Sequence, residues 1–290
     1  MLAALFGLCT SSATAAYPDQ SQTAAACGAC LASAAGTSLE GGISLYCEGN
    51  DTAALQLWRP LAETGDPAAE LAIGRLYENG AGTPVDYSAA IGWYRKAADK
   101  GVAQAQFYLA MMYDRGRGVP ASYPAALVLL LKAGDQGNAS AEHKLGEFYA
   151  QGLGVQKNLS ESVRWFRKVA DEGSIDAEFY LGLAYAGGDG VPQDYVEGYK
   201  WFTIAASEPL EPQILRDAFL NSRARVSAKM TPSQISEGEA RATAWRPVSQ
   251  EARFVLSSPD GPGSSTPPLN PVCARPPSAA ADGAAPKTGG

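Results

Sequence analysis

The sequence lacks most of the residues and patterns by which an enzyme or a nucleic-acid-binding protein is recognised. Its 290 residues include one histidine, His143, so no histidine-rich metal site can form. Asp and Glu outnumber Lys and Arg by 30 to 23, which gives a formal net charge of −7. An acidic chain without a basic stripe is poorly suited to neutralise nucleic-acid phosphates. No apolar run reaches the roughly 18 residues that a membrane-spanning helix needs. We therefore expect no nucleic-acid partner and no transmembrane segment.

Sequence motifs of common enzymes are also missing. Gly-x-Gly occurs four times at regular spacing, but without the Lys-Ser/Thr of a phosphate loop or the preceding strand of a dinucleotide fold. Residues 287–289 read KTG, as in β-lactamases, yet no S-x-x-K motif accompanies them. We predict no catalytic residue, no metal site and no cofactor. An enzyme or enzyme subunit acting on the cell wall or on β-lactams is the disfavoured alternative.

The N-terminus resembles a secretory signal. An apolar run from Leu2 to Cys9 is followed by small residues, with an A-x-A pattern at Ala13 and Ala15. This layout predicts a signal peptide over residues 1–16 and a periplasmic or secreted protein. The first basic residue is Arg59, so the usual cationic start of a signal is absent. A start codon assigned too far downstream would explain this absence. An ordinary alanine-rich N-terminus is the alternative to a signal peptide.

The cysteines fit an exported chain. Removal of residues 1–16 would leave Cys27, Cys30, Cys47 and Cys273, an even number that suits disulfides. The Cys27–Cys30 pair has no βαβ pattern around it for a thioredoxin site, and no second such pair for zinc. We favour a structural bridge from Cys27 or Cys30 to Cys47, and the connectivity stays open.

A 36-residue repeat dominates the remaining sequence. Four sequence features recur at this step in four copies, with Leu129 replacing Trp in the second copy of one of them. The recurring positions are Gly65, Gly101, Gly137 and Gly173; Tyr77, Tyr113, Tyr149 and Tyr185; the Gly-x-Gly loops that begin at Gly80, Gly116, Gly152 and Gly188; and Trp93, Leu129, Trp165 and Trp201.

Each copy is predicted to form two helices. In the first helix of the first copy, Ala69, Ile73 and Leu76 lie on one apolar face at helical spacing. Gly-x-Gly follows, where glycine can take the left-handed conformation that ends a helix. The next helices start at residues that cap N-termini well, namely Asp86, Ser122, Asn158 and Asp194.

Beyond the signal peptide of residues 1–16, the repeats divide the chain into four further parts. Residues 17–64 form an N-terminal helical cap with a degenerate repeat, and residues 65–206 hold the four full copies. Residues 207–247 are predicted to be helical, and the second of these helices opens with Thr231, Pro232 and Gln234 as a capping box. Residues 256–290, rich in Pro, Gly, Ser and Ala, are expected to be disordered.

The repeated motif, with its Gly-x-Gly loop, A-x2-W-[YF] and K-A-A-x2-G, resembles the Sel1-like repeat, a relative of the tetratricopeptide repeat, over residues 51–206. The resemblance implies an all-α, right-handed α-solenoid. It also implies a protein-interaction scaffold or adaptor of the bacterial envelope. The second copy departs from the motif at Leu129 and Leu130, and the fourth departs at Ile204.

Positions that vary between copies mark a candidate partner-binding groove. By resemblance to tetratricopeptide stacks, one side of the first helices lines the concave surface. Its residues at two positions of each copy are Ala72, Arg75, Tyr108, Met111, Lys144, Glu147, Tyr180 and Leu183. We call these eight residues the groove set and expect them to bind a protein or peptide. Packing of the same strip against the C-terminal helices is the alternative.

Two further features have structural interpretations. His143 stands where other copies have Leu71, Phe107 and Phe179, so we expect a partly buried packing residue. Trp93, Trp165 and Trp201 could bind a glycan or small molecule, but they occupy the repeat packing position, and we rank this function last.

Overall fold

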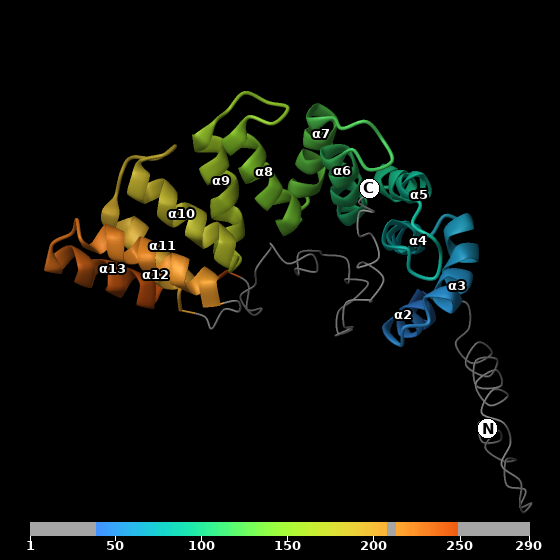
Figure 1. Cartoon of the computed structure of the whole chain (residues 1–290), viewed down its shortest axis with the longest axis horizontal. Coiled ribbons are helices and arrows are strands. Elements are labelled where there is room, and N and C mark those ends of the chain that lie inside the picture. Colours follow the sequence, from blue (N-terminus) through green and yellow to red (C-terminus); the bar gives the residue numbers. More distant parts are fainter. Residues whose placement is uncertain (1–38, 208–212, 249–290) are drawn as a thin grey trace, which may run out of the picture.

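The computed structural model describes residues 39–207 and 213–248, and the regular elements formed by these residues are α-helices joined by short loops. Figure 1 shows the helices following one another along an arch. No helix in these ranges is both long and apolar enough to cross a membrane. The prediction of an all-α solenoid is confirmed. The helices are α2 (Leu39–Cys47), α3 (Asp51–Glu63), α4 (Pro67–Asn79), α5 (Tyr87–Asp99), α6 (Ala103–Arg115), α7 (Tyr123–Gly134), α8 (Ala139–Gln151), α9 (Leu159–Asp171), α10 (Ile175–Gly187), α11 (Tyr195–Ala205), α12 (Gln213–Ser227) and α13 (Pro232–Ala244).

The helix ends follow from the repeated polar and glycine residues. Each predicted N-cap of the second helices accepts a hydrogen bond from the first turn, as Asp86 does from the Ala89 N–H at 2.9 Å. The first helices end at the first glycine of each Gly-x-Gly loop, in the left-handed conformation, with φ of 68° at Gly80. The capping box of Thr231 and Gln234 is also present. These local predictions are confirmed.

The two helices of a repeat pack an aromatic ring over a glycine. A Cβ atom on Gly74 would lie 2.6 Å from the Tyr94 ring, and Gly182 stands in the same relation to Phe202. The second repeat has Ala110 at this position, and its partner is the smaller Leu130. Ring and glycine therefore vary together, which explains why Leu130 leaves the fold intact.

The second glycine of each loop seats one repeat on the preceding one. A Cβ atom on Gly82 would lie 2.6 Å from the backbone of Asp51, at the start of α3. Gly190 meets the backbone of Leu159 in α9 in the same way, at 2.4 Å. The Gly-x-Gly loops thus serve packing between repeats.

Arginine–tyrosine hydrogen bonds link successive repeats. The Arg59 guanidinium donates to the Tyr77 hydroxyl at 3.0 Å, and Arg95 donates to Tyr113 at 3.3 Å. Arg167 and Tyr185 form the same bond. The second repeat carries Leu131 at the arginine position, and this makes the outer surface of α7 more apolar.

The C-terminal helices cap the stack through α11. Gly238 of α13 lies against Tyr199 of α11, and the Trp245 ring meets the Trp201 ring edge-on at 5.8 Å. Phe219 of α12 packs on Phe179 of α10, with ring centres 4.6 Å apart. Apolar surface at the end of the array is buried in this way.

Several predictions concern residues outside the described ranges. These are the signal peptide of residues 1–16, the expected disorder of residues 256–290, and the three cysteines Cys27, Cys30 and Cys273. Cys47 is described: it is the last residue of α2 and is disulfide-bonded. Which cysteine pairs with it stays a prediction.

Candidate functional site: a row of side chains on the first helices

The groove set runs along α4, α6, α8 and α10, and neighbouring members meet between repeats. The Arg75 guanidinium of α4 lies 5.3 Å from the centre of the Tyr108 ring of α6. Tyr108 also stacks on Tyr94 of α5, with ring centres 5.4 Å apart. Arg75 and Tyr108 are both partly buried, so contacts with their neighbours fix the positions of these two side chains.

Two members of the groove set are not open to a partner. Ala72 is 1% exposed and Met111 is 5% exposed, so our expectation that they line an accessible surface is wrong. Met111 packs into the core with Leu127 and Leu130, while Ala72 lies in the first core cluster. Helical spacing indicated their side of the helix, but the neighbouring helices cover these two positions.

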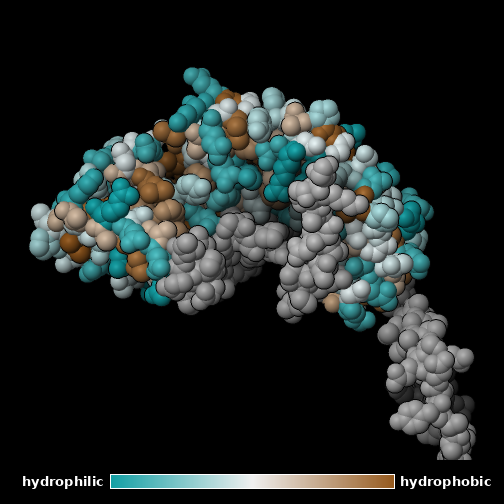
Figure 2. Space-filling view, in the orientation of Figure 1, coloured by the Kyte–Doolittle hydropathy of each residue, from teal (hydrophilic) through white to brown (hydrophobic). Residues whose placement is uncertain are grey.

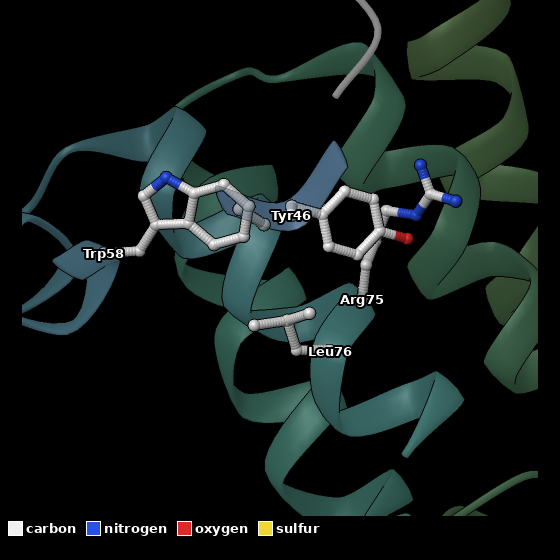
Figure 3. A pocket seen from close by; sticks show the side chains of 5 residues that line it. Tyr46, Trp58, Arg75 and Leu76 are labelled. Atoms are coloured by element: carbon white, nitrogen blue, oxygen red, sulfur yellow. The ribbon is translucent and has the colours of Figure 1, made fainter. Parts of the chain in front are cut away.

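A small recess opens beside Arg75 at the N-terminal end of the row. Its walls are Tyr46, Trp58, Ala72, Arg75 and Leu76, and it has room for about one water molecule. Figure 3 shows the Tyr46 ring between the Trp58 ring and the Arg75 side chain. Trp58 is fixed by donating from Nε1 to the Leu39 carbonyl at 3.1 Å. The recess is thus closed mainly by the N-terminal cap.

The middle of the row is a charged cluster on α8. Lys144 Nζ lies 2.6 Å from Glu147 Oε2, and His143 Nε2 lies 3.4 Å from Glu147 Oε1. Burial raises the pKa of Glu147, but the hydrogen bonds from His143 and Lys144 outweigh it and lower the pKa to about 2. Glu147 is therefore a carboxylate at every physiological pH.

His143 belongs to the packing of this cluster, as expected. It is buried and meets the rings of Phe166 and Tyr180 edge-on, at 5.3 and 5.9 Å between centres. Its Nδ1 atom has no hydrogen-bond partner among the described residues. The side chain therefore helps to hold Glu147 and Tyr180 in place.

The C-terminal end of the row is apolar and open. Tyr180 is 41% exposed and Leu183 is 42% exposed, although Tyr180 stacks on Phe166 with ring centres 4.5 Å apart. Burial raises the pKa of Tyr180, and the charges of Glu147 and Asp176 raise it further. Figure 2 shows hydrophobic surface around α10 between hydrophilic areas. This end offers an apolar anchor beside negative charge.

The C-terminal helices leave this end uncovered. Helices α12 and α13 pack chiefly on α11, and α12 reaches α10 at Phe179. Tyr180 and Leu183 keep two fifths of their surface exposed in their presence. Among the described residues, the row is therefore not filled by the protein's own C-terminal helices.

A second set of polar residues was missed by the sequence analysis. Glu70, Gln106, Glu142 and Glu178 occupy the same position of each repeat, and all are buried. Glu70 pairs with Lys100 at 2.6 Å, and Gln106 accepts from Gln136 at 2.9 Å. Their recurrence at the 36-residue step was a signal of a packing position. That these polar side chains are buried became evident only from the structure.

Glu142 has a second carboxyl nearby, that of Glu172. Burial raises the pKa of Glu142 to about 7, and the charge of Glu172 adds to this, although Lys168 lowers it. The Lys168 ammonium lies 3.4 Å from Glu142 Oε1. This carboxyl lies inside the stack and belongs to the packing between repeats.

The tryptophans are poorly placed for a ligand. Trp165 and Trp201 are buried, and Lys168 and Lys200 lie over their rings at 4.3 Å. Trp93 is partly buried under Lys96, at 3.9 Å.

No cluster of three or more His, Cys, Asp or Glu suited to a metal ion occurs in residues 39–207 and 213–248.

The repeats match a known family model. The model described as "Sel1 repeat" matches residues 67–102, 103–138, 139–174 and 175–209. These segments coincide with the helix pairs α4–α5, α6–α7, α8–α9 and α10–α11. The chain carries four Sel1 repeats over residues 67–209. Proteins with Sel1 repeats are generally protein-interaction scaffolds and are typically non-catalytic.

Solved structures of Sel1 repeat proteins resemble this one. A Sel1 repeat protein from Oxalobacter formigenes is 29% identical, with a TM-score of 0.58 over 68% of this chain and 87% of that chain. A protective antigen of uropathogenic Escherichia coli strains, c5321, which displays an SLR fold, is 27% identical. For c5321 the TM-score is 0.45, over 72% of this chain and 53% of that chain. No curated protein matches the sequence.

Proposed function

We propose that this protein is an adaptor of the bacterial envelope that binds a protein or peptide along the groove set. Six members of the set remain available for contact: Arg75, Tyr108, Lys144, Glu147, Tyr180 and Leu183. The anchor is the apolar end, Tyr180 and Leu183. The proposal includes export through the N-terminal signal and disulfide bonding of the N-terminal cap.

The exposure of Tyr180 and Leu183 carries this proposal. Apolar side chains at a partner surface contribute most when they are held rigidly and are surrounded by polar groups. Tyr180 is held by Phe166 and His143, and Glu147 and Asp176 lie close enough to affect its pKa. A partner segment with an apolar residue next to Lys or Arg complements this arrangement.

An enzymatic function finds little support in the geometry. Hydrolysis of a cell-wall or β-lactam substrate needs a nucleophile and a general base around a pocket. The recess beside Arg75 contributes one guanidinium and the phenol of Tyr46, and it holds about one water molecule. We propose that the protein performs no chemistry.

Site-specific photo-crosslinking tests the proposed binding surface. A crosslinking amino acid would replace Tyr180 in the protein made by its own organism, and adducts would be identified by mass spectrometry. The matched control replaces Val85, which is 52% exposed and lies outside the groove set in the loop after α4. A discrete protein adduct from position 180 alone supports the proposal. Equal adducts from both positions, or none, contradict it.

A charge variant measures the contribution of the anchor once a partner is identified. Leu183→Asp should weaken binding by about 30-fold, the size of a hot-spot loss. Val85→Asp should leave the affinity unchanged, because it lies away from the row. Equal affinities for wild type and Leu183→Asp would show that the anchor lies elsewhere.

A further inference from the structure

The outer surface of α7 carries an apolar stripe. Pro124, Val128 and Leu131 follow the i, i+4, i+7 spacing of one helix face. Val128 is 54% exposed, Pro124 is exposed and Leu131 is partly buried. We call these three residues the α7 stripe. It lies on a second helix of the repeat, away from the groove set on the first helices.

The other second helices do not expose apolar residues at these positions. Val128 corresponds to Gly92, Arg164 and Lys200, and Leu131 corresponds to Arg95, Arg167 and Thr203, as aligned by the 36-residue step. The two arginines of α9 are engaged, because Arg164 pairs with Glu161 and Arg167 donates to Tyr185. The α7 stripe is therefore specific to the second repeat and is not a requirement of the fold.

Helix α11 also has an apolar outer face, and this face is covered by the C-terminal part of the chain. Val196 corresponds to Pro124 and is buried, as is Tyr199 one turn later. Both lie under α13: a Cβ atom on Gly238 would be 2.8 Å from the Tyr199 ring and 3.4 Å from the Val196 carbonyl. The C-terminal part of the chain thus covers the apolar outer face of α11.

The chain then continues from α11 toward α9. Arg241 of α13 pairs with Glu197 of α11 at 3.2 Å, and Trp245 meets Trp201. Three residues later, the Val248 N–H donates to the Asp171 carbonyl at 2.7 Å, at the last residue of α9. The next second helix in this direction is α7.

The sequence beyond Val248 has a segment that suits the α7 stripe. Phe254, Val255 and Leu256 are the one run of three large apolar residues in positions 249–290. Five residues separate them from Val248, and an extended chain of that length spans up to about 20 Å. Helix α8 packs on both α9 and α7, and packed helices lie about 8–10 Å apart, so the axes of α9 and α7 are at most about 20 Å apart. The segment can therefore reach from the end of α9 to the outer face of α7.

We propose that Phe254–Leu256 of the same chain docks on the α7 stripe. Phe254 and Leu256 supply apolar surface to Val128 and Leu131, and Arg253 falls near the exposed carboxylate of Asp135, the C-cap of α7. The C-terminal part of the chain would then follow the second helices from α11 past α9 to α7. It would tie the second repeat to the C-terminal cap and leave the groove set free.

The test uses the full-length protein with a photo-crosslinking amino acid at position 254. After irradiation and proteolysis, mass spectrometry should find residue 254 joined to a peptide containing Val128 or Leu131. A mixture of isotopically light and heavy protein separates links within one chain from links between two copies. The matched control places the crosslinker at Leu269, which lies farther along the C-terminal sequence.

Arginine variants test the stripe without threatening the fold. Val128→Arg combined with Leu131→Arg introduces the residues that α9 carries at the same positions, Arg164 and Arg167. The link from position 254 should fall by about tenfold, because the apolar contact is lost. Val85→Arg should leave the link unchanged. The proposal is overturned if position 254 links to α10, to a second copy or to nothing, or if the double variant leaves the yield unchanged.

Discussion

The ring-over-glycine contact between paired helices predicts that alanine at Gly146 of the third repeat will lower the free energy of unfolding. The loss should disappear when Phe166, the ring over this glycine, is also replaced by a smaller residue. Gly146→Ala would place a Cβ atom 2.7 Å from the Phe166 ring, closer than carbon atoms pack. The second repeat shows the permitted combination, Ala110 with Leu130. The pair Gly146→Ala and Phe166→Leu transplants that combination into the third repeat.

Two opposing effects set the magnitude of the single change. Alanine favours a helix interior over glycine by about 1 kcal/mol. Overpacking a dense core costs about 1–3 kcal/mol, so Gly146→Ala should lower the free energy of unfolding by about 1 kcal/mol. With Phe166→Leu present, the clash disappears and the gain in helix propensity remains. The two changes should therefore couple favourably by about 2 kcal/mol.

The coupling is measured in a double-mutant cycle. Urea unfolding, followed by circular dichroism, gives the free energy of unfolding of wild type, both single variants and the double variant. Loss of the Tyr180 stacking on Phe166 occurs in the single and double leucine variants alike, so it cancels. Ala110→Gly is the control, since it removes a methyl group that fits and should cost about 1 kcal/mol. Additivity within about 0.5 kcal/mol, or a stabilising Gly146→Ala, would refute the reasoning.

Three further predictions concern buried charges. The pKa of Glu142 is raised to about 7, so the folded state loses stability as pH rises from about 4.5 through 7. Above pH 8, the free energy of unfolding of Glu142→Gln should therefore exceed that of wild type by up to about 3 kcal/mol. Urea titrations at several pH values measure this difference. The pKa of Glu147 is lowered to about 2, so its contribution is lost as pH falls from about 4.5 toward 2, and Glu147→Gln should flatten that acid limb by up to about 3 kcal/mol. Lys100→Met leaves the buried Glu70 without its ammonium and should cost about 3 kcal/mol in the free energy of unfolding, most of it recovered by adding Glu70→Gln; an unchanged midpoint would contradict the pairing.

The repeat made the secondary structure readable from the sequence. Four copies of the same step showed where helices begin and end, because caps such as Asp86 and helix-ending glycines such as Gly80 act within a few residues of themselves. His143 was placed correctly for a similar reason: its equivalents in other copies are apolar.

The candidate site was predicted less completely. Helical spacing gave the side of the first helices on which all eight groove residues lie. Burial of Ala72 and Met111 depends on residues from other helices and on the angle at which they cross, and no local pattern encodes that angle. The sequence analysis did not identify the α7 stripe, because the exposure of Val128 became evident only from the structure.

By itself, the sequence determined the repeat, the helices and the order in which they stack, because these depend on residues close together in the chain or 36 apart. The tertiary structure decided which side chains remain at the surface. It also decided which carboxyl groups change their pKa, as Glu142 and Glu147 do in opposite directions. Both outcomes depend on neighbours from different helices, and the local sequence does not specify how closely those neighbours approach.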